Sequence, residues 1–172
     1  AETLLVEARR RFPEDGEAAN NLALLCELTE RPAEAIDLYT FGLERKPDDV
    51  GSRFNLGRLL LRDGRSAEAA AVFEEVLTWT PEDFEAWVNL GVAWEGQGKT
   101  GDARTAYEHA KGLVPARPEP YFNLARLDLA DERPEDAANQ LRAFTAIDST
   151  SREGLRARLL IGRLEEAASA EP

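Results

Sequence analysis

The stretch "WVNLGVAWEGQGKTGDARTAYEHAKGLVP", residues 87–115, contains residues that recur through the chain at one fixed spacing. Asn89 and Leu90 return 34 residues earlier as Asn55 and Leu56. The same period relates asparagines at 21, 55, 89 and 123, leucines at 22, 56, 90 and 124, alanines at 35, 69, 103 and 137, and prolines at 13, 47, 81 and 115. Because no insertion or deletion breaks this register, the chain is built from internal repeats.

Each repeat has the apolar spacing of two helices. In "FNLGRLLLRDG", Leu56, Leu59 and Leu60 follow the three-and-four spacing of a helix face, and Gly64 ends the helix. The segment "AEAAAVFEEVL", residues 67–77, shows the same spacing for a second helix. Pro32 and Pro134 occur just after the corresponding turn, where the first turn of a helix tolerates proline. We therefore predict helix pairs joined by short turns.

The period divides the chain into a single all-α domain, residues 1–172. We predict a half repeat at 1–15, full repeats at 16–49, 50–83, 84–117 and 118–151, and a capping helix at 152–168. The capping helix departs from the repeat pattern, as the end of a repeat array usually does. We expect Leu155, Leu159 and Leu164 to cover the apolar side of the fourth repeat. Asp128 replaces a large core residue of that repeat.

The repeat pattern resembles the tetratricopeptide repeat. The residues that carry the resemblance most fully are Trp87, Leu90, Gly91, Trp94, Ala103, Tyr107, Ala110 and Pro115. The resemblance implies a right-handed superhelical solenoid in which the first helix of each pair lines the concave side. It says little about function, because one fold can serve many partners.

The repeated asparagine is the main candidate for a binding role. It precedes the core leucine by one residue, so it faces the predicted concave side, and a side-chain amide can both donate to and accept from a peptide main chain. The alternative is that it caps or bridges neighbouring repeats. Together with apolar and basic neighbours on the same face, the predicted partner-binding set is Asn21, Asn55, Asn89, Asn123, Phe54, Arg58, Arg62, Val92, Phe122 and Arg126.

The same face is predicted to be partly apolar. Phe54, Val92 and Phe122, with Leu61, Val88 and Leu129, are expected to stay exposed unless a partner covers them. The lysine that chaperone-binding tetratricopeptide domains use to clamp a carboxylate is absent, because its possible positions hold Phe54, Val88 or Glu119. We therefore expect a partner segment that is extended or helical, partly apolar and locally acidic, rather than a chaperone C-terminus.

Composition excludes several classes of function. The net charge of −12 argues against nucleic-acid binding, and no apolar run reaches the length of a membrane span. Arginine outnumbers lysine 18 to 3, as in GC-rich bacterial genomes. We expect a soluble protein of the cytoplasm or periplasm, with the cytoplasm favoured. The absence of methionine suggests a processed chain or a piece of a longer one.

No constellation of residues predicts catalysis, a cofactor or a metal. The segment "AWEGQGKT", residues 93–100, fits a relaxed phosphate-loop pattern, but a true phosphate loop follows a strand. We place it instead in the turn between two helices. His109 is the only histidine and is expected to face outward, and Cys26 occupies a core position.

The sequence thus predicts a non-catalytic protein–protein interaction module that binds a peptide or protein segment in its concave groove. Two alternatives stay open. One is a scaffold that assembles with itself as a homo-oligomer, and the other is an interaction segment excised from a larger protein.

Overall fold

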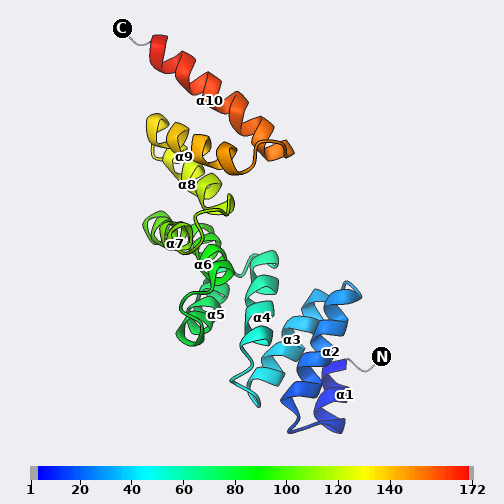
Figure 1. Ribbon diagram of the computed structural model, residues 1–172. Coiled ribbons are helices and arrows are strands. Elements are labelled where there is room, and N and C mark those ends of the chain that lie inside the picture. The colour runs from blue at the N-terminus through cyan, green and yellow to red at the C-terminus, as the bar shows by residue number, and fades with distance from the viewer. Residues whose placement is uncertain (1–3, 171–172) are drawn as a thin grey trace. The chain divides into compact units, whose positions relative to one another are not determined.

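The computed structural model describes residues 4–170, and this part of the chain contains ten α-helices (Figure 1). Residues 1–3 of the predicted half repeat lie outside the described range. The helices are α1 (Leu4–Arg11), α2 (Gly16–Leu28), α3 (Pro32–Leu43), α4 (Val50–Arg62), α5 (Ser66–Trp79), α6 (Phe84–Gly96), α7 (Thr100–Leu113), α8 (Glu119–Ala130), α9 (Pro134–Ile147) and α10 (Arg152–Ala170). The predicted all-α fold of helix pairs is confirmed, while the boundaries between repeats stay a prediction.

The chain forms two compact units, residues 1–97 and residues 98–172. Unit 1 contains α1 to α6 and unit 2 contains α7 to α10. Within unit 1, α3 packs against α2 and α4, and α5 packs against α4 and α6. Within unit 2, α8 packs against α7 and α9, and α9 packs against α10. Each helix therefore buries its apolar face against neighbours in sequence, as repeat proteins do.

Aspartates 34 residues apart begin the first helices of unit 1. The carboxylates of Asp15, Asp49 and Asp83 accept hydrogen bonds from backbone N–H groups three residues later, at 2.9 to 3.0 Å. Such caps satisfy N–H groups that the helix leaves unpaired. Burial alone would raise the pKa of Asp49, but hydrogen bonds from Ser52 and Asn20 hold it below its usual value. The acids after the repeat prolines thus fix where these helices start.

The core of unit 1 consists of the residues that recur at the repeat period. Ala35 and Ala69 are fully buried, as are the aromatic rings of Tyr39 and Phe73. A Cβ atom added at Gly57 of α4 would lie 2.8 Å from the ring of Phe73 on α5. The small residue on the first helix and the ring on the second therefore fit directly against each other.

The core of unit 2 closes against a face of α10 that includes Leu164, as predicted, but not the other two leucines expected there. Ala157 is buried, and Leu160, Ile161 and Leu164 pack with it against the buried residues Ala125, Leu141 and Phe144. Leu155 and Leu159 are 54% and 72% exposed, so the prediction that they cover the fourth repeat is wrong. Residues 157, 160, 161 and 164 share one side of a helix, and 155 and 159 lie on the opposite side.

Asp128 of α8 is buried in place of a large apolar residue. Its Oδ1 lies 2.7 Å from Arg104 of α7 and 2.8 Å from Arg133, which precedes α9. Buried charges persist when they are paired and hydrogen-bonded. The carboxylate thus links three consecutive segments of unit 2 through ion pairs.

The turn inside each helix pair contains one residue with positive φ. These residues are Glu30 (57°), Gly64 (76°), Gly98 (73°) and Glu132 (56°), again 34 apart. Side chains rarely adopt this conformation, and glycine adopts it without strain. Each of these four turns therefore requires a residue with positive φ, and in two of them that residue is glycine.

We expect Gly64→Ala and Gly162→Ala to change stability in opposite directions. An added Cβ meets nothing within 4 Å at either position, so space does not distinguish them. Gly64→Ala forces a side chain into positive φ and should cost about 1 kcal/mol or more. Gly162→Ala lies inside α10 and should stabilise by about 0.5–1 kcal/mol. Urea unfolding followed by circular dichroism measures both, and an equal sign for the two would contradict the turn geometry.

Candidate functional site

The predicted partner-binding residues all lie on first helices of the repeats. In unit 1, α2 carries Asn21, α4 carries Phe54, Asn55, Arg58 and Arg62, and α6 carries Asn89 and Val92. In unit 2, α8 carries Phe122, Asn123 and Arg126. The structure thus places seven of the residues on the alternate helices α2, α4 and α6 of unit 1 and the other three on the single helix α8 of unit 2.

The repeated asparagines have four different environments. Asn21 is exposed. Asn55 donates to the hydroxyl of Tyr39 at 3.3 Å, and Asn89 donates to the carbonyl oxygen of Glu85, one turn earlier in its own helix, at 2.7 Å. The Asn123 side-chain oxygen accepts from Arg126 at 3.4 Å. Only Asn55 therefore uses its amide to link two helices.

A polar network on α2, α3 and α4 includes two residues that the sequence did not single out. The hydroxyl of Tyr39 donates to Glu27 at 2.8 Å, and Arg58 donates to the other Glu27 oxygen at 3.1 Å. Burial and the bond to Glu27 raise the pKa of Tyr39 far above its usual value. Tyr39 could have been noticed in the sequence, because it recurs as Phe73 and Tyr107 at the repeat period and is therefore expected in the core. A buried tyrosine hydroxyl usually needs a hydrogen-bond partner, so a polar neighbour could have been expected there.

The apolar part of the predicted face is smaller than expected. Phe54 is half-buried and meets Phe73 edge-on, with ring centroids 5.6 Å apart. Val92 and Phe122 stay 38% and 40% exposed. The remaining predicted members, Leu61, Val88 and Leu129, are half-buried, so the prediction of a broad exposed patch is wrong. Phe54 and Leu61 pack against the core of unit 1.

The three predicted arginines differ in how firmly they are held. Arg58 is paired with Glu27, whose side chain is largely buried, and Arg126 donates to the side-chain oxygen of Asn123 at 3.4 Å. Arg62 ends α4, is exposed, and forms no ion pair with a residue of the described range. Of the two predicted arginines in unit 1, Arg62 can therefore bind an anion without first breaking an internal ion pair.

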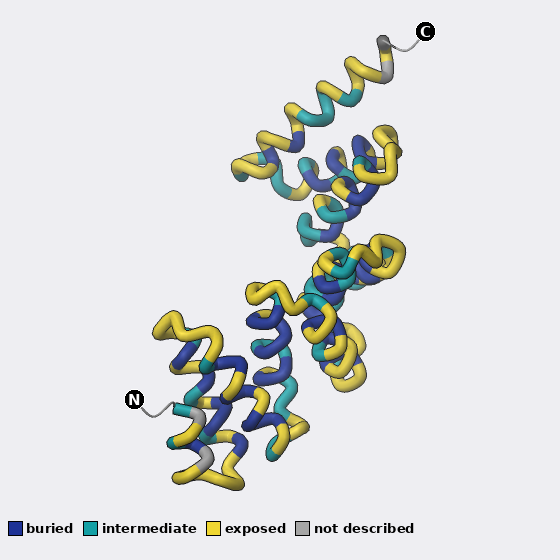
Figure 2. The backbone as a smooth tube through the Cα atoms, turned by 180° about the vertical axis from the view of Figure 1, so that it is seen from behind, coloured by how far each residue is buried: buried dark blue, intermediate teal, exposed yellow. Residues whose placement is uncertain are grey.

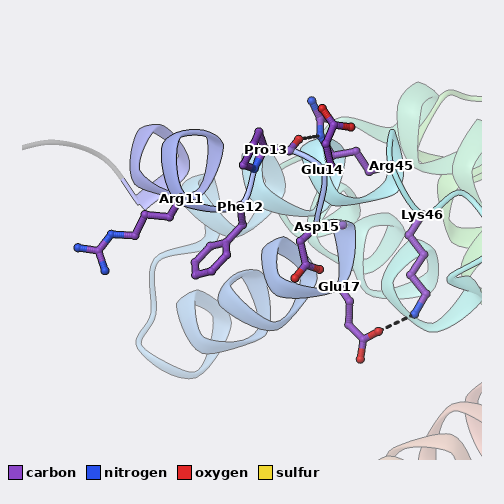
Figure 3. Close-up of a pocket in the computed structure, with 9 residues that line it drawn as sticks. Arg11, Phe12, Pro13, Glu14, Asp15, Glu17, Arg45 and Lys46 are labelled. Atoms are coloured by element: carbon purple, nitrogen blue, oxygen red, sulfur yellow. Dashed lines mark hydrogen bonds and ion pairs between the residues drawn. The ribbon is translucent and has the colours of Figure 1, made fainter.

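An open hollow of about 570 Å³ lies where α1 ends and α2 begins (Figure 3). Two contacts tie its sides together. Arg45 donates to the carbonyl oxygen of Pro13 at 2.6 Å, and Lys46 lies 3.0 Å from Glu17. The hollow therefore belongs to the loops that join helices, and none of the predicted site residues lines it.

The phosphate-loop look-alike lies in a turn between helices, as predicted. α6 ends at Gly96 and α7 begins at Thr100, with the positive-φ residue Gly98 between them. Cys26 is buried, which raises the pKa of its thiol, and His109 is exposed on α7. Among residues 4–170, no cluster of three or more potential metal ligands is found, and no helix is long and apolar enough to cross a membrane.

We expect Lys99→Ala to have no functional or energetic consequence. Lys99 is exposed and precedes α7, so its loss should change the free energy of unfolding by no more than about 0.5 kcal/mol. Titration calorimetry with ATP and magnesium should give no binding heat for the wild-type protein. Saturable binding that disappears in the variant would contradict this prediction.

Comparisons with known proteins agree on the fold. Solved structures similar to this chain include MamA of Desulfovibrio magneticus RS-1, from residue 41 to its end, with a TM-score of 0.78 at 20% identity over 86% of this chain and 84% of that one. PilF of Pseudomonas aeruginosa has a TM-score of 0.75 at 22% identity, over 96% of this chain and 74% of that one. The type III secretion chaperone SycD of Yersinia enterocolitica was solved with a peptide of the translocator YopD. Its structure has a TM-score of 0.66 at 16% identity, over 70% of this chain and 95% of that one.

Sequence comparison identifies the family. No curated protein matches the chain. The profile described as "Tetratricopeptide repeat" matches residues 1–50, 30–84 and 54–118. These matches cover well over half of the chain, and the protein belongs to the tetratricopeptide repeat family.

Proposed function

We propose that the protein is a non-catalytic interaction module that binds a segment of a partner protein along the first helices of unit 1. The observation that carries the proposal is that α2, α4 and α6 each contain an asparagine at the same repeat position, while α4 also carries the exposed Arg62 and α6 the exposed Val92. Side-chain amides suit an extended main chain, whose N–H and C=O groups are otherwise unpaired. The peptide complex of SycD, a structure of similar fold, supports this assignment.

The polar and apolar groups of this face define the partner's chemistry. Arg62 favours an acidic group on the ligand, and Val92 with the half-buried ring of Phe54 favours apolar side chains. In unit 2, α8 combines an aromatic ring, an asparagine and an arginine in the same way, with Phe122, Asn123 and Arg126. We therefore expect a partner segment that is partly apolar and locally acidic.

We expect the double variant Asn55→Ala with Asn89→Ala to weaken peptide binding about tenfold or more. Each lost amide bond should cost about 0.5–1.5 kcal/mol of affinity. The effect on folding should be small, because the Asn55 bond to Tyr39 is long and the Asn89 bond stays within α6, where alanine is the better helix former. Fluorescence anisotropy measures binding, with peptides selected on the wild-type protein from a displayed 12-residue library.

Two further variants separate a groove role from a fold role. Arg62→Glu should weaken binding in a salt-dependent way, since Arg62 has no internal ion pair to lose. Asn139→Ala, an exposed asparagine on the second helix α9, is the matched control and should bind normally. If the double alanine variant binds normally but melts several degrees lower, the asparagines serve the fold and the proposal fails.

A further inference from the structure

The outer face of α10 is apolar at two positions that nothing in the described chain covers. Leu155 and Leu159 lie one helical turn apart and are 54% and 72% exposed, on the side of α10 opposite the residues that pack on the core. Figure 2 shows that exposed stretches alternate with buried and half-buried ones along this last helix. The buried face of α10 already completes the core of unit 2. These two leucines are therefore not needed to close that core.

The repeat register shows what normally covers this face. Leu155 and Leu159 follow Tyr121 and Ala125 by 34 residues, and Leu159 follows Gly57 by three repeats. Gly57 and Ala125 are both buried. The ring of Phe73, on the second helix of its repeat, sits directly over Gly57. The outer face of α10 thus corresponds to the face that a second helix covers in a complete repeat.

Three exposed arginines lie along α10 on one side of the two leucines. Arg152, Arg156 and Arg163 are exposed and, spaced by four and seven residues, share one side of α10. None of the three forms an ion pair with a residue of the described range, whereas Arg158 donates to the carbonyl oxygen of Ser149. In a chain of net charge −12, this edge is locally basic.

We propose that the outer face of α10 docks an amphipathic, acidic helix of a partner protein in the place of a second repeat helix. Leu159 is large where Gly57 and Ala125 are small, so the docking helix should present a small residue such as alanine opposite it. Its acidic residues should lie along the edge formed by Arg152, Arg156 and Arg163.

Charge and size argue against other occupants. The α1 helix of a second copy is itself basic at its end, with Arg10 and Arg11, and would be repelled by the arginine edge. A membrane surface is disfavoured because the face offers only two apolar side chains, whereas interfacial helices bury a long apolar stripe. An acidic protein helix matches both the leucines and the arginines.

A titration monitored by NMR tests the proposal on the 15N-labelled chain. The probe is a synthetic peptide with the sequence of α5, residues 66–79, carrying Phe73→Ala; its three acids are Glu68, Glu74 and Glu75. The control peptide has lysine at those three positions. We expect saturable shifts of amides between 152 and 166 with the acidic peptide, and binding at least tenfold weaker with the lysine peptide.

A charge-reversal variant of the protein tests the role of the arginines in the same titration. Arg156→Glu with Arg163→Glu should weaken the acidic peptide at least tenfold and strengthen the lysine peptide, which also shows that the variant is folded. Asn55→Ala with Asn89→Ala should leave this binding unchanged, so this proposal and the proposed function fail separately. The absence of saturable shifts, or equal affinity for both peptides, would overturn the assignment.

Other occupants give distinct results that would also overturn it. Sedimentation without peptide should show a monomer, and a dimer abolished by Leu159→Glu would assign the face to a second copy. Vesicles containing anionic phospholipid should not co-sediment with the protein, and co-sedimentation abolished by the same variant would assign the face to a membrane.

Discussion

Replacing Phe73 by alanine is expected to lower the free energy of unfolding by about 3–5 kcal/mol. The ring is fully buried, lies over Gly57 and meets Phe54 edge-on at 5.6 Å. Its removal leaves a cavity where α4 and α5 meet, and the surrounding helices can fill such a cavity only in part. Urea unfolding followed by tryptophan fluorescence measures the loss, because Trp79, Trp87 and Trp94 all belong to unit 1.

The matched control for this variant is Phe12→Ala. Phe12 is the same residue type in the same unit, but it is 41% exposed. Its loss should cost about 1 kcal/mol, since most surface substitutions have small effects. Equal losses for the two variants would contradict the assignment of Phe73 to the centre of the core.

The helix pairs could be predicted from the sequence because their signals are local and repeat. Pro32 and Pro134 begin α3 and α9, and Gly64 and Gly98 supply the positive φ of two turns. These features depend on residues within a few positions of one another. The 34-residue period repeats each of them, so that weak local signals add up to a firm prediction of the fold.

The face of α10 could not be predicted, because the helix has two apolar sides. Leu155 and Leu159 show helical spacing, and so do Leu160 and Leu164. Periodicity alone does not say which stripe meets α9. In the structure, the side with Leu160 and Leu164 packs against the core, because Ala157 and Ile161 lie on the same side and make its apolar surface wider.

Contacts between residues far apart in sequence were also beyond prediction. The partner of Asp128 on α7 lies 24 residues away, and the partner of Asn55 lies 16 residues away on another helix. An amide or carboxylate has the same local pattern whether it faces a neighbouring helix or a ligand. The sequence could therefore place the candidate site on the first helices but not divide its residues between the fold and a partner.

Removing residues 152–172 is expected to make the protein aggregate and to lower its melting temperature by several degrees. The deletion uncovers Phe144, Leu141 and Ala125, which α10 keeps at most 4% exposed. A newly exposed apolar cluster of this kind favours association. Light scattering at several protein concentrations and a thermal scan by circular dichroism measure the two effects.

Two double variants of α10 separate loss of the buried face from loss of the helix itself. Leu160→Ser with Leu164→Ser removes two leucines from the face that meets α9 and should reproduce much of the effect of the deletion. Leu155→Ser with Leu159→Ser removes two leucines from the outer face and should leave the protein monomeric, with little change in melting temperature, because these side chains are already exposed. If the outer pair destabilises the protein as much as the inner pair, α10 does not pack on α9 through Ala157, Leu160 and Leu164.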